Sequence, residues 1–153
     1  MKTRKILVWI PILFTTLYSC QDEFCVDATT PELIIRFYDK ENINNPKSIS
    51  LIVWANEKDT LYEGINTDSL AVPLDTKNTS VTYHFSILDR LNSKEEIRIE
   101  YTTEDIFVSK ACGFKSVFNN LNINTTNLNW IDSHTKVATK IINENEAHVK
   151  IYH

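Results

Sequence analysis

The stretch EEIRIEYTTE, residues 95–104, carries the pattern that decides the fold. Ile97, Ile99 and Tyr101 fall on one side of an extended chain, and the residues between them are charged or polar. This period of two is typical of a β-strand with one face against a core and the other in water.

The same period recurs along most of the chain and predicts about nine short strands. No stretch keeps a period of 3.6 residues over three turns, so we expect an all-β protein. Residues 49–54 are apolar on both sides and predict a central strand, while Pro73 predicts an edge or a strand end. Residues 143–146 predict a four-residue hairpin loop. Besides 95–104, the expected strands are 33–38, 49–54, 70–74, 81–87, 106–110, 114–118, 137–142 and 147–152.

Repeated short strands separated by turns predict an antiparallel β-sandwich of about eight or nine strands, immunoglobulin-like or transthyretin-like. The chain has 153 residues, of which 42% are hydrophobic and 24% charged, which suits one globular domain. The 2 glycines leave no glycine-rich phosphate loop.

The N-terminus has the form of a secretory signal. Lys2, Arg4 and Lys5 precede an apolar run over residues 6–17. Twelve helical residues span roughly 18 Å, well short of the ~30 Å hydrocarbon core of a bilayer. We therefore expect a cleaved signal peptide and not a transmembrane helix.

The run ends in Leu17-Tyr18-Ser19-Cys20, which resembles the lipobox of bacterial lipoproteins. The resemblance implies cleavage before Cys20 and acylation of that cysteine. Each buried methylene contributes about 0.8 kcal/mol, so two or three acyl chains hold a protein stably on a membrane. The expected organisation is a signal peptide at 1–19, a lipidated cysteine and tether at 20–31, and one β-sandwich domain at 32–153.

Cleavage makes the chain more acidic. Loss of residues 1–19 removes three of the 16 basic residues and none of the 20 acidic ones, which leaves 13 against 20 and a net charge of −7. This balance argues against nucleic acid as a partner. Gln21-Asp22-Glu23 resembles the surface-export signal of Bacteroidetes lipoproteins. The expected location is the bacterial outer membrane, on its periplasmic face or at the cell surface.

Three cysteines are present, and the lipobox accounts for Cys20. Cys25 and Cys112 then remain in an oxidising compartment, where disulfides persist. We expect these two to pair. Two buried free thiols, or a metal site, are the alternatives, and two thiols without histidines at ligand spacing make a poor zinc site.

Residues 119–134 contain six asparagines, and asparagine favours turns. A connection of this length is functional, disordered, or contains a further strand. Its apolar residues either cover the end of the sandwich or form an exposed contact patch around Trp130 and Ile131.

Three blocks of sequence resemble a family of small Bacteroidetes envelope lipoproteins of unknown function. The resemblance covers most of residues 20–120 and implies an envelope location and a β-rich fold. It implies no activity and no functional residues. The blocks are Cys25 with residues 28–31 and 33–39; residues 59–62, 68–70 and 72–75; and Tyr101 with residues 107–109 and 111–114.

The sequence contains no recognisable catalytic constellation. Neither Ser109 nor Ser116 lies in a Gly-x-Ser-x-Gly motif. The histidines are scattered, and we expect His84 and His148 to be solvated at outward strand positions. We therefore expect no enzyme activity, no metal and no cofactor. The four histidines are His84, His134, His148 and His153.

Two short motifs, Asp59-Thr60-Leu61 and Asp68-Ser69-Leu70, resemble the O-glycosylation pattern of exported Bacteroidetes proteins. The resemblance marks Thr60 and Ser69 as candidate acceptors. The alternative is that both are ordinary residues at strand entries.

These observations favour a membrane-tethered, non-enzymatic binding protein of the envelope. It would be an accessory or binding subunit of an outer-membrane complex. The alternative is a module that binds carbohydrate or another small ligand at the cell surface, with Trp54, Trp130 or tyrosines lining its site.

Overall fold

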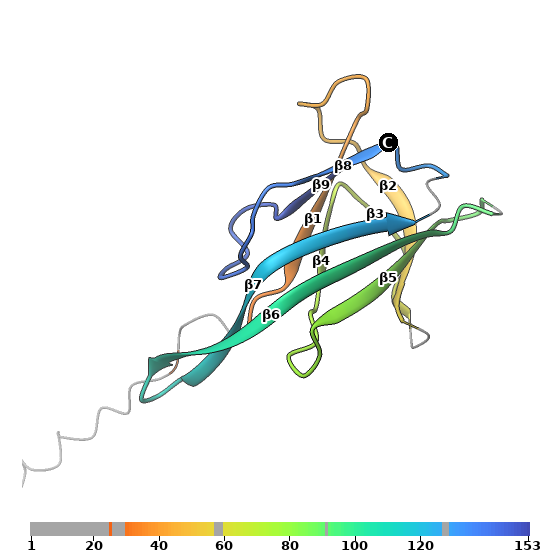
Figure 1. The fold of residues 1–153 in the computed structure, drawn as a ribbon. Coiled ribbons are helices and arrows are strands. Elements are labelled where there is room, and N and C mark those ends of the chain that lie inside the picture. Colours follow the sequence, from red (N-terminus) through yellow and green to blue (C-terminus); the bar gives the residue numbers. More distant parts are fainter. Residues whose placement is uncertain (1–24, 26–29, 57–59, 91, 127–128) are drawn as a thin grey trace, which may run out of the picture.

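A computed structural model describes residues 25, 30–56, 60–90, 92–126 and 129–153 (Figure 1). The predicted signal peptide and Cys20 lie outside these residues. The described residues form nine strands in two sheets, in the orders β4-β1-β9-β8 and β3-β2-β5-β6-β7. The strands are β1 (Leu33–Tyr38), β2 (Ile49–Ala55), β3 (Thr60–Thr67), β4 (Ser69–Val72), β5 (Ser80–Ile87), β6 (Glu95–Ser109), β7 (Gly113–Thr126), β8 (Ser133–Lys136) and β9 (Val149–Tyr152).

The predicted all-β sandwich is confirmed. Alternate residues of both sheets, among them Leu33, Leu51, Phe85 and Ile99, meet in one buried core. The strand predicted to be central, β2, lies between β3 and β5, and β4 lies at an edge just before Pro73. All strand pairs are antiparallel except β1 with β9, which run parallel.

The long hairpin β6–β7 was predicted in pieces. The separate strands expected at 106–110 and 114–118 are continuations of β6 and β7, and the asparagine-rich stretch supplies the second half of β7. A register shift between Glu100 and Thr102 places one extra residue on β7. Asn120 has φ 55° there, a conformation that asparagine tolerates.

The sequence prediction missed β3. Its residues are mostly exposed or half-buried, and Gly64, with φ 78°, interrupts the alternation. Two register shifts against β2 further disturb the pattern. An irregular edge strand of this kind has too little buried surface to show in a hydrophobic pattern.

The predicted strand 137–142 and the hairpin loop at 143–146 were wrong. The partner of β9 is β8, which precedes this segment. Residue Ile141 instead forms a β-bridge with Phe118 and enters the core. The segment thus leaves its own sheet and covers part of the free edge of β7, which shields the edge from pairing with another chain.

Three tyrosines join the two sheets at the β4 edge. The hydroxyl of Tyr83 donates to the carbonyl of Pro73, and Tyr62 and Tyr101 donate to the carbonyls of Ala71 and Asp75 at 2.6 and 2.9 Å. Alternate carbonyls are used because successive backbone carbonyls of an extended chain point to opposite edges of the strand. Burial raises the pKa of Tyr83 above its ordinary value, so the hydroxyl stays protonated and donates.

We predict that Tyr83→Phe lowers the free energy of unfolding by about 1–2 kcal/mol, because it leaves a carbonyl without its donor. Tyr62→Phe, at a half-buried position, should cost less since water can replace its hydroxyl. Urea denaturation with an unchanged m value measures both losses. Equal losses in the two variants would contradict the prediction.

Candidate functional site

The predicted pairing of Cys25 with Cys112 is confirmed, and the two Cα atoms lie 4.9 Å apart. Cys112 belongs to the turn of the β6–β7 hairpin, which lies at one end of the molecule (Figure 1). The Thr30 hydroxyl also accepts a hydrogen bond from the Ser116 N–H at 3.2 Å. Cys25 and Thr30 therefore each contact the hairpin.

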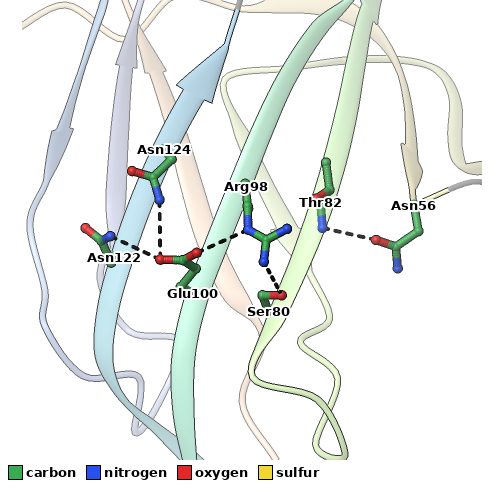
Figure 2. Close-up of polar contacts among 7 residues, drawn as sticks. All are labelled: Asn56, Ser80, Thr82, Arg98, Glu100, Asn122 and Asn124. Carbon is green, nitrogen blue, oxygen red and sulfur yellow. Dashed lines mark hydrogen bonds and ion pairs between the residues drawn. The ribbon is translucent and has the colours of Figure 1, made fainter.

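A polar cluster lies on the outer surface of the five-stranded sheet (Figure 2). Arg98 donates through Nε to Glu100 at 3.1 Å and through Nη2 to the Ser80 hydroxyl at 3.1 Å. The amides of Asn122 and Asn124 both donate to Glu100 Oε2 at 3.4 Å. We call Ser80, Arg98, Glu100, Asn122 and Asn124 the polar face.

Strand alternation produces the polar face. Ile97, Ile99 and Tyr101 point into the core, so Arg98 and Glu100 must point outward. The β6–β7 register then sets Arg98 opposite Asn124 and Glu100 opposite Asn122. Sequence inspection did not identify this site, because the signal exists only once the register of the two strands is known.

The polar face carries no net charge, because one guanidinium and one carboxylate compensate each other. The hydrogen bond from Arg98, together with those of the two amides, lowers the pKa of Glu100, which favours the ionised form. The side-chain carbonyls of both asparagines are additional acceptors. Such a set of donors and acceptors suits a neutral ligand rich in hydroxyl groups better than an anion.

A shallow hollow of about 300 Å³ adjoins this face, with Tyr101 and Asn120 among its lining residues. The centroids of the Trp54 and His84 rings lie 5.3 Å apart, and Lys94 Nζ lies 5.7 Å from the centroid of the Trp54 ring. Trp54 belongs to β2, which β5 separates from β6, and its ring already packs against other side chains.

The expectation that His84 and His148 are solvated was wrong, since they are 8% and 5% exposed. Trp54 packs beside His84. His148 Nδ1 accepts the Ile34 N–H at 2.9 Å, and its ring also hydrogen-bonds the Asn143 backbone. The alternation of residues predicted that these side chains point outward from the core. It could not predict that other residues cover them there.

Of the two interpretations of the asparagine-rich stretch, the structure agrees with apolar residues that cover the core, and the exposed contact patch around Trp130 and Ile131 was wrong. Ile131 is part of the core, and half-buried Trp130 packs against it and donates its indole N–H to the Ser93 carbonyl at 2.7 Å. Sequence reasoning also missed Glu95, a buried carboxylate that accepts backbone N–H groups from residues 129–131. The signal was available, because Glu95 shares its side of β6 with Ile97.

The remaining predicted residues are in separate places. Thr60 and Ser69 are exposed residues at the starts of β3 and β4, and their modification stays a prediction. The Ser109 hydroxyl accepts the Cys112 N–H, and the Ser116 hydroxyl donates to Asp105 at 2.6 Å. Cys20 lies outside the described residues.

Within the described ranges, no group of three or more His, Cys, Asp or Glu residues is placed to hold a metal ion. The same part of the chain contains no helix with the length and apolarity needed to cross a bilayer.

Burial lowers the pKa of His148, so unfolding takes up a proton below the ordinary histidine pKa of about 6.5. The contribution of His148 to stability should therefore be complete above that pH and fall as the pH drops towards 5. His148→Asn keeps a hydrogen-bond acceptor, because Oδ1 can replace Nδ1, but the new side chain takes up no proton. Proton uptake on unfolding should therefore be smaller by up to about one proton per molecule, and the free energy of unfolding should fall less steeply with decreasing pH. His153, whose pKa burial also lowers, accounts for part of the remaining slope.

Thermal unfolding between pH 7 and pH 5 measures this slope. His134→Gln, at a half-exposed position on β8, is the matched control. An unchanged slope in His148→Asn would contradict the role assigned to the buried ring.

No curated protein and no solved structure matches the chain. Residues 50–153, which include seven complete strands, all of β2 except Ile49 and the whole polar face, match a family of unknown function, DUF6452. The match covers more than half of the chain, and the protein is therefore a member of the DUF6452 family.

Proposed function

We propose that this protein is a lipid-anchored, non-enzymatic binding subunit of the bacterial envelope. Acylated Cys20 would attach it to the outer membrane, where it would serve a partner protein of that membrane. The observation that carries the proposal is the disulfide between Cys25 and the hairpin turn. It joins the folded domain to a residue only five positions after the predicted anchor.

Several further features support an extracytoplasmic, tethered protein. Disulfides persist in oxidising compartments and are rare in the cytosol. Five residues reach at most about 17 Å, so acylation of Cys20 would hold the hairpin turn close to the bilayer. The N-terminal sequence has the resemblance to Bacteroidetes lipoproteins described above. A short tether fixed to one end of a domain suits a subunit that must stay close to the membrane.

A second candidate function is the binding of a neutral carbohydrate by the polar face. Arg98, Glu100 and the two asparagine amides form a hydrogen-bonding surface without net charge, and a hollow lies beside it. Sugar hydroxyls both donate and accept, which matches this mixture of groups. This ligand is compatible with a tethered protein at the cell surface.

Metabolic labelling with a fatty-acid probe tests the anchor. The wild-type chain should carry the label in its native envelope, and Cys20→Ala should lose it completely, because the thiol is the acylation site. Asn66→Ala, at an exposed position outside the lipobox, is the control for expression and should keep the label. An unlabelled wild-type protein would overturn the proposal.

Mild crosslinking of the lipidated protein in its own envelope, followed by purification, tests the partner. An outer-membrane protein should be recovered at constant stoichiometry with the wild type. Recovery of the subunit without such a protein would contradict the assigned role as an accessory subunit.

A glycan array tests the second function. The wild type should bind neutral glycans, and Asn122→Ala should weaken that binding about tenfold, the effect of roughly 1.4 kcal/mol. Asn66→Ala, at an exposed position on the opposite edge strand β3, should leave binding unchanged. Absence of glycan binding by the wild type would exclude this candidate.

A further inference from the structure

The end of the β6–β7 hairpin carries two exposed phenylalanines. Phe107 and Phe114 are 59% and 69% exposed, more than any other large hydrophobic residue that the structure describes. They lie directly opposite each other in the ladder, with ring centroids 5.4 Å apart. We call residues 106–115 the hairpin tip.

The core does not account for this pair. On the next rung of the same side, the Ser116 hydroxyl donates to Asp105 at 2.6 Å. Phe118, one rung further, is fully buried. A polar rung therefore separates the two exposed rings from the core, and they form an apolar patch of their own.

The composition of the hairpin tip differs from the rest of the chain. Residues 106–115 contain two lysines and no acidic residue, whereas the chain after Cys20 is strongly acidic. Exposed aromatic rings beside lysines are typical of surfaces that enter the interfacial region of a bilayer.

The disulfide indicates what covers the patch. Cys112 lies two residues before Phe114 in the hairpin tip and is bonded to Cys25. Cys20 is five residues before Cys25, a reach of about 17 Å at full extension. An acyl chain on Cys20 would therefore place the bilayer surface within reach of the phenylalanine pair.

We propose that the hairpin tip inserts Phe107 and Phe114 into the headgroup and upper acyl region of the membrane that holds the lipid anchor. This inference rests on the proposed lipid anchor and adds a second, non-covalent contact. The tip and the anchor together would fix the orientation of the sandwich, which a single flexible tether cannot do.

Depth-dependent tryptophan quenching tests the proposal. The full lipidated protein is placed in phosphatidylcholine vesicles whose acyl chains carry bromine, with Phe114→Trp as the reporter. The wild type contains Trp54 and Trp130, so its emission is subtracted from that of the variant. The remaining emission, from the introduced tryptophan, should be blue-shifted and strongly quenched. Phe107→Trp on the facing strand is a second reporter and should behave in the same way.

Ile43→Trp is the matched control. Ile43 is 58% exposed and belongs to the β1–β2 connection, which lies at the other end of the molecule from the hairpin tip (Figure 1). Its added emission should be quenched several-fold less than that of Phe114→Trp.

Flotation of the vesicles and the mass of the Cys20 peptide distinguish a failure of the proposed insertion from a failure of the proposed lipid anchor. Protein that floats and is acylated, but whose tip reporters are quenched no more than Ile43→Trp, would overturn the insertion and leave the anchor intact. This outcome would also be expected if the rings contact a protein. Protein that neither floats nor carries acyl chains would overturn the anchor, and the insertion with it.

Discussion

The disulfide between Cys25 and Cys112 is the constraint on which the arrangement of this protein depends. It closes a sequence separation of 87 residues, and loop-closure entropy makes such a bond worth roughly 4–5 kcal/mol. That is comparable to the net stability of many domains. It also holds Cys25 at the hairpin turn, and Thr30 contacts Ser116 of β7.

Inside the sandwich, Glu95 has a comparable role. It occupies an inward position of β6, where an apolar residue would be expected, and it is 1% exposed. A buried carboxylate is costly unless hydrogen bonds compensate. Glu95 Oε1 accepts hydrogen bonds from the backbone N–H groups of residues 129–131, which fixes the point where the chain leaves the larger sheet and returns to the smaller one as β8. A polar residue at an inward strand position thus fixes the segment in which the chain passes from one sheet to the other.

The alternation of apolar and polar residues predicted the features that depend on a single strand. It failed for the features that depend on how two strands pair. The cores of β1, β2, β5 and β6 follow from period two, and the disulfide follows from counting cysteines. The asparagine-rich half of β7 does not, because asparagine is poor in strands and only Leu121 and Ile123 mark its inner side. The polar face could not be predicted either, because Glu100 lies opposite Asn122 only through the register of β6 and β7. Residues 137–142 have strand-like alternation, but Phe118 of the other sheet supplies their contact.

The β6–β7 hairpin connects the two surfaces for which we propose functions, and its geometry keeps them apart. Seven residues separate Phe107 from Glu100 along β6, a distance of about 23 Å at the usual rise of a strand. Interfacial insertion reaches only about 5–10 Å into a bilayer. With the hairpin tip at the membrane and the strands rising from it, the polar face would lie beyond the headgroups, in water. One rigid hairpin can therefore both contact the lipid and present a ligand-binding surface, because its length exceeds the depth of the interface.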